Sequence, residues 1–512
     1  MSDANLILAH DLGTSGNKAT LYSSAGERLG SVTESYPTHF FNGCWAEQEP
    51  DDWWRAVCAS TRQLLAETKV DPADVAVVAL SGQMMGCTPV DAAGRALRPS
   101  MLYCDQRATA EADALLARLP LERFYRIVGH RVSASYTLEK FMWLRAHEPE
   151  VFAKTAKTLC AKDYVNFRLT GRMATDYSDA SGTNAFDINT FTWSDEVLAC
   201  ADIPKDLFPE ALPSTEILGG VTAEAAAATG LRAGTPVAVG GGDGSAAGVG
   251  VGCVRPGSAY NCMGSSSWIA LTVKEPVVDP GMRTMNWAHC VPGYLHPSGT
   301  MQTAGSSFKW LAEQLCAEEA DEAARTGVSK YALIDAKAAS SPVGANGVLF
   351  LPYMLGERTP WWNPDARGAF IGLNLATRRA DMLRAVLEGV SMNLGYIVDI
   401  FRAGGVSFED GLRIIGGGAQ SRVLRQILAD ACGCPVQTLE STAEATSMGA
   451  AIIGGVACGA FAGFDVVDDL LKTSETTHPV PENVAFYRGR TEVLVKAYES
   501  LVGVYGDLAA GK

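Results

Sequence analysis

Residues 6–22 read LILAHDLGTSGNKATLY and predict the hairpin on which the fold is built. The apolar run Leu6–Ala9 predicts a buried strand, and Ala19–Tyr22 predicts a second strand. Between them, His10 and Asp11 are followed by a turn of glycine and hydroxyl residues at 13–16. Such a turn presents several backbone N–H groups at one point, so it is suited to bind an anion.

The segments that follow indicate an α/β domain. A further strand is expected at 28–32, which makes the hairpin a meander, and a helix is expected at 50–68. The apolar run 75–80 predicts another buried strand, which ends at the polar turn Ser81-Gly82-Gln83. A helix is expected at 109–119, and the alternation of strands and helices is typical of the α/β class.

A second glycine-rich junction lies near the middle of the chain. The predicted strand 235–239 runs into GGGDGS at 240–245. Residues 258–271 then repeat the first layout, with a strand, a tight turn of glycine and serine residues, and a strand. The two similar turns indicate an internal duplication. We place the domain boundary at the turn after residue 254, which gives domains 1–254 and 255–512.

A third junction lies in the second half of the chain. The predicted strand 412–415 is followed by GGGAQS at 416–421, and helices are expected at 422–432 and 443–455. All three junctions place backbone N–H donors at the carboxyl end of a strand, where α/β proteins bind ligands.

Composition excludes several classes of protein. The chain has 512 residues and a net charge of −15, without the clustered Lys and Arg of a nucleic-acid-binding surface. No stretch is long and apolar enough to predict a membrane span. Thirteen cysteines without C-x-x-C spacing predict reduced thiols in a cytoplasmic protein and do not support structural zinc.

Two familiar nucleotide-binding motifs are also excluded. The chain has no G-x-x-x-x-G-K-[ST] segment. GDGSAA at 242–247 fits the variant dinucleotide fingerprint, but no acidic residue lies between Asp243 and Glu275 to bind a ribose.

One carboxylate stands beside each of two glycine turns, Asp11 and Asp243. Phosphoryl transfer needs a cradle for the phosphates, carboxylates that hold hydrated Mg²⁺, and a base near the acceptor hydroxyl. The two aspartates are suited to the last two tasks. The alternative is that both are turn or helix-cap residues.

With these segments in view, the sequence resembles the FGGY carbohydrate kinases, members of the actin and sugar-kinase fold, and within them it looks most like the xylulokinases. The resemblance covers nearly the whole chain. The matching segments, in the family's order, are DLGTSGNKA at 11–19, SGQMMG at 81–86, CDQRA at 104–108, GGGDGSAAGVG at 240–250, NCMGSSSW at 261–268, GERTPWWNPDARGAFIGL at 356–373 and GGGAQSRVLRQILAD at 416–430.

The resemblance implies an α/β fold of two ribonuclease H-like, actin-like ATPase domains, with the active site in the cleft between them. It implies a sugar-binding first domain, a nucleotide-binding second domain, and ATP and Mg²⁺ as cofactors. Asp11 matches the aspartate that positions Mg²⁺, and Asp243 matches the general base. The residues implied to contact phosphates or adenosine are Thr14, Ser15, Gly264, Ser265, Ser266, Gly417, Gly418 and Ser421.

The implied reaction is phosphorylation of a ketopentose, with D-xylulose to D-xylulose 5-phosphate as the first expectation. The implied sugar contacts, besides Asp243, are Gln83, Met84, Met85 and Asp105. Two positions depart from the xylulokinase pattern, because Met85 replaces a histidine and Gly244 replaces an asparagine. A lost polar contact in a buried site costs about 1–3 kcal/mol, so these changes favour another ketose or polyol as the alternative acceptor.

Other interpretations remain open from the sequence. The acceptor could be of the ribulose, erythritol or glycerol type, or the chain could be an actin-like ATPase that is not a kinase. Trp361 and Trp362 could stack on a sugar, although packing at a domain interface is the stronger interpretation. His10 is predicted to be structural. The family resemblance also implies a homodimer as one possibility.

Overall fold

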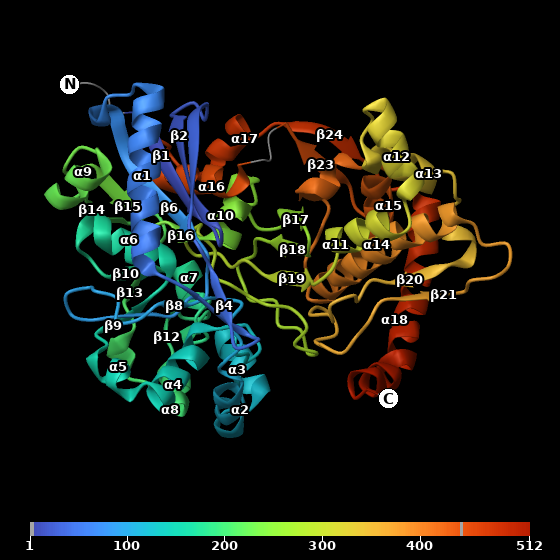
Figure 1. Cartoon of the computed structure of the whole chain (residues 1–512), viewed down its shortest axis with the longest axis horizontal. Helices are drawn as coiled ribbons and strands as arrows, with labels where there is room; N and C mark the ends of the chain where they lie inside the picture. Colours follow the sequence, from blue (N-terminus) through green and yellow to red (C-terminus); the bar gives the residue numbers. More distant parts are fainter. Residues whose placement is uncertain (1–4, 441–443, 512) are drawn as a thin grey trace.

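The computed structural model describes residues 5–440 and 444–511, and Figure 1 shows two α/β halves side by side. The first half is built on a seven-stranded sheet in the order β14-β15-β6-β1-β2-β3, with β16 paired to β6. The strands are β1 (Leu6–Leu12), β2 (Gly16–Ser23), β3 (Arg28–Ser35), β6 (Val75–Gly82), β14 (Ile217–Gly220), β15 (Pro236–Ala238) and β16 (Gly241–Gly242).

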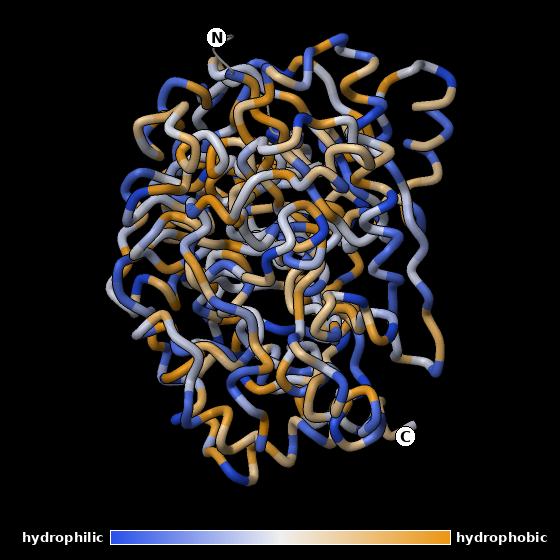
Figure 2. Tube along the Cα trace, turned by 90° about the vertical axis from the view of Figure 1, so that its left-hand side faces the viewer, coloured by the Kyte–Doolittle hydropathy of each residue, from blue (hydrophilic) through white to orange (hydrophobic). Residues whose placement is uncertain are grey.

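Strand β1 is buried on both faces. Leu6 and Leu8 belong to the same apolar cluster as α1 (Pro50–Thr68), whereas Ile7 and Ala9 belong to the cluster that contains α16 (Ala445–Ala457). Because successive side chains of a strand point to opposite faces, the unbroken apolar run serves both layers. In Figure 2 the segments that run through the interior are largely apolar, and hydrophilic residues gather on the outer loops and turns.

The second half repeats the topology of the first. Its six-stranded sheet has the order β19-β18-β17-β22-β23-β24. Across each sheet, an antiparallel meander is followed by two parallel strands and an antiparallel edge strand, although along the chain this edge strand comes before its neighbour in the first half and after it in the second. The strands are β17 (Ala259–Met263), β18 (Ser267–Leu271), β19 (Ser298–Met301), β22 (Leu412–Ile415), β23 (Val436–Leu439) and β24 (Thr473–Thr477). The matching sheets are consistent with the predicted internal duplication.

The largest apolar core lies in the second half, around the long helix α14 (Arg379–Ala403). The other helices and short strands of this half are α11 (Gly305–Gln314), α12 (Ala317–Thr326), α13 (Lys330–Ala339), α15 (Arg422–Cys432), α17 (Val467–Leu470), α18 (Pro481–Ala509), β20 (Leu349–Leu351) and β21 (Ala369–Ile371).

A mainly helical region is inserted in the first half after β6 and forms the lower lobe in Figure 1. Its elements, with the short strands β4 and β5 that precede α1, are β4 (His39–Phe41), β5 (Trp45–Gln48), β7 (Thr88–Val90), β8 (Ser100–Met101), α2 (Thr109–Arg118), α3 (Leu121–Val128), α4 (Thr137–His147), α5 (Pro149–Lys154), β9 (Lys157–Leu159), β10 (Ala174–Asp176), α7 (Tyr177–Ser181), β11 (Phe186–Asp187), β12 (Thr192–Trp193), α8 (Asp195–Ala201) and β13 (Glu210–Leu212). The helices α6 (Ala161–Thr170), α9 (Ala223–Thr229) and α10 (Asp243–Gly250) complete this half.

The predicted helix limits agree closely with the structure in most places. The helices expected at 50–68 and 422–432 are α1 and α15, and the helix expected at 109–119 ends one residue earlier, at Arg118. The helix expected at 443–455 begins at Ala445 and ends at Ala457, and residue 443 lies outside the described residues. This helix belongs to the second half of the sequence, yet it packs against β1 and β6 of the first sheet. Within the described ranges, no helix is long and apolar enough to cross a membrane.

Candidate active site

The carboxyl ends of three parallel strands meet at one edge of the first sheet. Asp11 on β1 stands opposite Ser81 on β6, and Ser81 stands opposite Gly241 on β16. Asp243 follows β16 directly and is the first residue of α10. The sheet register therefore brings together the two aspartates that the sequence analysis selected, although they are 232 positions apart along the chain.

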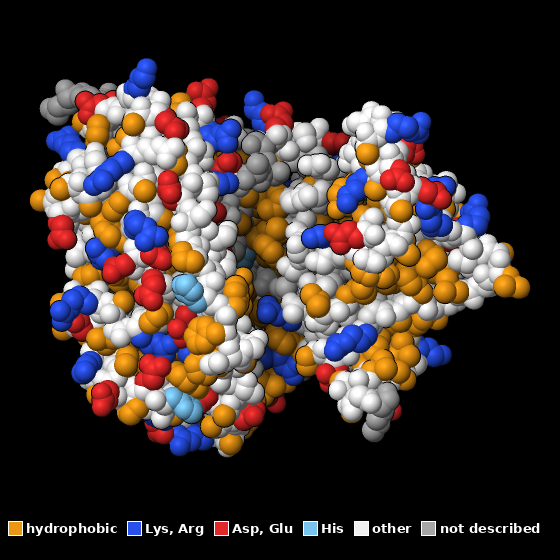
Figure 3. All heavy atoms as spheres, in the orientation of Figure 1, with side chains coloured by type: hydrophobic (Ala, Val, Ile, Leu, Met, Phe, Trp, Pro, Cys, Tyr) orange, Lys and Arg blue, Asp and Glu red, His pale blue; other side chains and the backbone are white. Residues whose placement is uncertain are grey.

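A pocket of about 360 Å³ lies between the two halves, where Figure 3 shows a deep groove. It is lined by Thr14, Met84, Met85, Tyr103, Ser133, Ser135, Tyr136, Asp243, Gly244, Ser245, Tyr260, Ser266, Trp268, Ala270, Met285, Trp287, His296, Ser298, Thr300, Arg358 and Trp362. Five of the predicted site residues are among them, namely Thr14, Met84, Met85, Asp243 and Ser266. The volume and the mixture of aromatic and polar side chains suit a small polar ligand.

Asp243 has the electrostatic character of a general base. Burial and, to a smaller extent, the nearby charge of Asp11 raise its pKa to about 7, and the N–H of Gly244, which donates to Oδ1 at 2.7 Å, has the opposite effect. A carboxylate that titrates near neutrality is both a competent proton acceptor and substantially ionised at pH 7. The sequence alone suggests the ordinary pKa of an aspartate for Asp243, and in the structure its pKa is higher.

Asp11 provides the second carboxylate. Burial raises its pKa, while the hydroxyl of Ser81, which donates to Oδ1 at 3.2 Å, and the charge of Lys18 lower it. Two neighbouring carboxylates with raised pKa values fit a divalent cation, because a metal charge between them would stabilise both ionised forms. Asp11 can therefore hold Mg²⁺ directly or through water, as the resemblance implied.

The first two glycine turns stand at the ends of matching hairpins. In the first, Tyr36 and Thr38 donate to the carbonyls of Gly13 and Thr14, at 2.5 and 3.2 Å, and Ser15 is exposed at the tip. In the second, the carbonyl of Gly264 accepts from the N–H of Gly305 at 3.0 Å, so the turn rests on the start of α11.

Other members of the second turn differ in exposure. Ser265 is exposed at its tip, and Ser266 lines the pocket. Both turns keep backbone N–H groups near the pocket, which is the property expected of a phosphate cradle.

No residue of the third turn, between β22 and α15, is among those that line the pocket. A Cβ atom at Gly418 would lie 2.1 Å from Cγ of Met263, so only glycine allows this approach to β17. A Cβ atom at Gly417 would meet nothing within 4 Å, so this position borders open space. The hydroxyl of Ser421 caps α15 by accepting from the N–H of Leu424 at 3.0 Å.

The acceptor loop, residues 83–86, contains three of the predicted sugar contacts and is divided between the pocket wall and the interior. Met84 and Met85 line the pocket, and Met85 has a left-handed backbone with φ of 63°. Gln83 is buried, and its Nε2 donates to Oε1 of Gln48 at 2.7 Å. Nε2 of Gln48 donates in turn to the carbonyl of Thr14 at 2.6 Å. Gln83 thus links the acceptor loop to the first phosphate turn and does not reach the pocket.

Asp105, the other predicted sugar contact, is not among the residues that line the pocket. The side chain is completely buried, and its carboxylate accepts from the guanidinium of Arg107 at 2.9 and 2.7 Å and from the N–H of Ala46 at 2.7 Å. Arg107 lies only two residues away along the chain, and its ion pair with Asp105 is buried in the interior. Tyr103 of the same segment lines the pocket instead.

Several pocket residues were not among the site residues predicted from the sequence. Oη of Tyr260 donates to the carbonyl of Gly244 at 3.0 Å and accepts from Nε1 of Trp268 at 3.0 Å, so these rings support the segment that follows Asp243. His296 is buried, and burial lowers its pKa to about 4, so it is neutral. Arg358 also lines the pocket and forms no ion pair with any carboxylate of the described residues.

The tryptophan pair has two separate roles. Trp361 stacks on Tyr498 with 3.9 Å between ring centroids, which is aromatic packing within the second half and not at the domain interface that the sequence analysis favoured. Trp362 lines the pocket, and the guanidinium of Arg131 lies 5.4 Å from its ring centroid. His10, predicted to be structural, is fully buried and contacts Asn17 at 3.1 Å.

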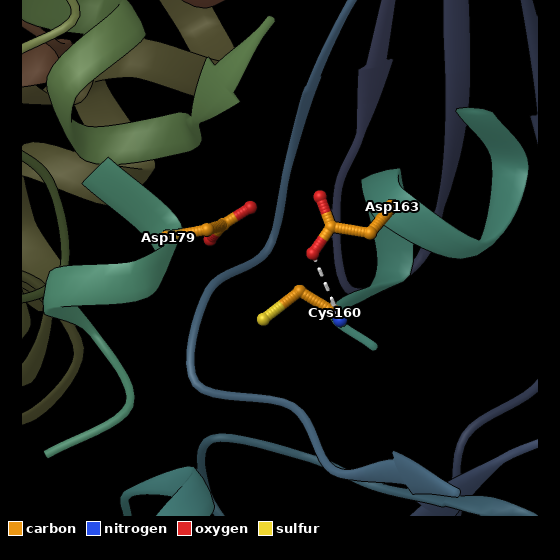
Figure 4. Close-up of side chains that lie close together, drawn as sticks. All are labelled: Cys160, Asp163 and Asp179. Atoms are coloured by element: carbon orange, nitrogen blue, oxygen red, sulfur yellow. Dashed lines mark hydrogen bonds between the residues drawn. The ribbon is translucent and has the colours of Figure 1, made fainter. Parts of the chain in front are cut away.

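A second carboxylate cluster lies in the interior behind the pocket. Figure 4 shows Asp163 and Asp179 facing each other beside Cys160, and one atom of each could ligate a metal ion. The ammonium of Lys162, however, lies 2.6 Å from Asp163, 3.0 Å from Asp176 and 3.1 Å from Asp179. The lysine already supplies a cation, so we interpret the cluster as a structural bridge between α6 and α7.

Known proteins match this chain over most of its length. Residues 6–250 match the N-terminal domain, and residues 259–458 the C-terminal domain, of the FGGY family of carbohydrate kinases. A xylulose kinase of Escherichia coli K12 is 34% identical, covering 96% of this chain and 98% of that enzyme. A gluconokinase of Bacillus subtilis is 29% identical, covering 98% and 97%. The crystal structure of a xylulose kinase from Rhodospirillum rubrum superposes with a TM-score of 0.89 at 31% identity, covering 98% of this chain and 100% of that one.

Proposed function

This chain belongs to the FGGY family of carbohydrate kinases, and from that premise we propose that it transfers the γ-phosphoryl group of ATP to D-xylulose, forming D-xylulose 5-phosphate. The observation that carries the proposal is the position of Asp243, a carboxylate with a pKa of about 7 in the wall of a pocket between the two halves. The similarity to xylulose kinases over nearly the whole chain supports the choice of acceptor.

In the proposed reaction, Asp243 accepts the proton of the acceptor hydroxyl while that oxygen attacks the γ-phosphorus. Phosphoryl transfer depends mainly on positioning and on stabilising charge. Backbone N–H groups of the turns at 13–16 and 264–266 would hold the phosphates. Mg²⁺, held by Asp11, would supply the positive charge that the phosphates require.

The proposed nucleotide position extends from these turns toward the third junction. Gly417 borders open space, and no side chain at this residue would obstruct a purine. Thr14 and Ser15 from the first half and Ser265 and Ser266 from the second would contact the phosphates. The nucleotide would then contact both halves, and their approach would exclude water that competes with the sugar hydroxyl.

An anionic sugar acid is a second candidate acceptor. Arg358 faces the pocket without an ion-pair partner in the described part of the chain, so it could pair with a carboxylate of the acceptor. The similarity to gluconokinases is consistent with this candidate. Arg358 could equally stabilise the transferred phosphoryl group, so the acceptor must be identified by experiment.

The deciding experiment measures ADP release with MgATP and a panel of D-xylulose, D-ribulose, erythritol, glycerol and D-gluconate. We expect D-xylulose to give the highest kcat/KM. A higher value for gluconate would replace the first candidate with the second. If no acceptor raises turnover above the rate without acceptor, the kinase proposal fails and an actin-like ATPase remains.

We further propose a cytoplasmic location, supported by thirteen cysteines that are all free of disulfides. The homodimer expected from the resemblance stays a prediction, and sedimentation equilibrium would test it.

A further inference from the structure

The start of helix α4 holds the acceptor loop by two consecutive carbonyls. Nζ of Lys140 donates to the carbonyl of Met85 at 3.0 Å, and the hydroxyl of Thr137 donates to the carbonyl of Gly86 at 3.0 Å. Nζ of Lys140 also donates to the carbonyl of Ser135 at 2.5 Å. Met85 and Ser135 both line the pocket, so one ammonium joins two segments of its wall.

Lys140 is an unusual residue for this position. Its side chain is fully buried, and it has no carboxylate within ion-pair distance in the described ranges. Burial lowers its pKa to about 8, and the charge of Asp105 opposes this effect. A buried cation is costly unless it is hydrogen-bonded, so the two carbonyls are what make this charge tolerable.

Met85 depends on such support. Its φ of 63° lies in the left-handed region, which side chains other than glycine and asparagine rarely adopt. A residue stays in this conformation only when its surroundings determine it. The contact from Lys140 to the carbonyl of Met85 and the contact from Thr137 to the carbonyl of Gly86 hold the two peptides that follow the Cα atom of Met85, whose side chain lines the pocket.

We propose that Lys140 is a positioning residue for the acceptor: it fixes Met85 and Ser135 at the pocket wall and so determines how tightly the sugar is bound. The inference rests on the proposed function, because it takes the pocket to be the acceptor site. Asp105 then does not contact the sugar, and its negative charge favours the charged form of Lys140.

The chain offers a matched control. Nζ of Lys157 also donates to two backbone carbonyls, those of Asp206 and Phe208, at 2.5 and 3.0 Å, but Lys157 does not line or support the pocket. Lys140→Met and Lys157→Met therefore remove the same kind and number of contacts from the same half. Thr137→Val removes the neutral contact to Gly86 and changes the side-chain volume little.

The experiment compares the KM of the acceptor and of MgATP in these variants. Since hydrogen bonds from charged groups contribute more than neutral ones, Lys140→Met should raise the acceptor KM roughly tenfold or more, and Thr137→Val about threefold. The kcat and the KM of MgATP should stay within about twofold of the wild-type values, because the variant loses acceptor binding that is equal in the ground state and the transition state. Lys157→Met should leave both KM values unchanged.

An acceptor KM within about twofold of wild type in folded Lys140→Met, or an equal rise in both KM values, would overturn the proposal. If Lys140→Met does not fold, an unchanged acceptor KM in Thr137→Val overturns it. If the wild type phosphorylates no acceptor, the proposed function fails, but amide hydrogen exchange still tests the contact. Residues 83–87 should then exchange faster in Lys140→Met, or in Thr137→Val, than in wild type and Lys157→Met, and equal rates contradict the inference.

Discussion

Replacing Asp243 by asparagine should stabilise the protein while abolishing phosphoryl transfer. Burial and the charge of Asp11 raise the pKa of Asp243 to about 7 in the folded state, from 3.8. The folded state therefore binds this proton more tightly than the unfolded state does. This contribution to stability is present in full below pH 3.8 and is lost as the pH rises through 7. Asparagine carries no charge, so the variant avoids the cost of the buried carboxylate at neutral and alkaline pH.

The magnitude follows from the two pKa values. A shift from 3.8 to about 7 corresponds to about 4 kcal/mol at 1.36 kcal/mol per pKa unit. Asp243 is only partly buried at the pocket wall, and water that enters the pocket reduces this energy. We therefore expect a stabilisation of roughly 2 kcal/mol at pH 8 and less than half of that at pH 5. For a domain of about 250 residues, 2 kcal/mol raises the melting temperature by roughly 4–8 °C.

The assay is thermal unfolding of wild type and Asp243→Asn, without ligands, at pH 5, 7 and 8. Asp381→Asn is a control of opposite sign. Burial alone would raise the pKa of Asp381, but hydrogen bonds from Ser341, Arg378 and Asn346 lower it to about 2. Its stabilisation is present above pH 3.8 and is lost only as the pH falls toward 2, so Asp381→Asn should destabilise at all three pH values.

The reasoning is refuted if Asp243→Asn melts at or below the wild-type temperature at pH 8, or if the difference between them does not increase from pH 5 to pH 8. Substantial kinase activity in the variant would remove Asp243 from the role of base, because a neutral amide cannot accept the proton.

Three further predictions follow from the same site and its surroundings. Because Asp243 must be ionised to act, kcat/KM for the acceptor should rise with pH and level off near or above 7, and a flat profile between pH 5.5 and 8 contradicts this role. Lys162→Met leaves three buried aspartates without their cation, so its free energy of unfolding, measured in urea, should be roughly 3–5 kcal/mol lower than that of wild type. An unfolding midpoint equal to that of wild type would contradict the structural bridge. Trp362→Ala should raise the acceptor KM with little change in melting temperature, whereas Trp361→Ala should lower the melting temperature, and the reverse pattern would show that the two roles are exchanged.

The elements of the fold that the sequence predicted are those with strong local signals. The apolar run at 6–9 and the polar turn after it indicate a strand and its end without reference to any other segment. The contact of α16 with the first sheet is different. Gly449 and Gly454 indicate a closely packed helix, but the partner lies more than 350 residues away along the chain, and no local pattern specifies it.

The candidate site shows the same limit. Asp11 lies near the end of a strand, Thr14 and Asp243 follow strands, and strand ends are recognisable in a sequence. Asp105 also stands in a turn, but the direction of its side chain is decided by Arg107, whose guanidinium closes on it in the interior. Trp362 lies in an irregular segment with φ of 51°, where no helical or strand period indicates which side chains face inward.

The internal duplication explains how an acidic chain can present a site for a triphosphate. Each half contributes a hairpin turn to the groove between the halves, so the N–H donors come from backbone geometry and not from Lys or Arg. One helix of each half also packs closely against the other. A Cβ atom at Gly449 of α16 would lie 1.8 Å from the carbonyl oxygen of Ala246 in α10. Asp243 is the first residue of α10. We therefore expect a change in the relative position of the halves to act on the helix that carries the proposed base.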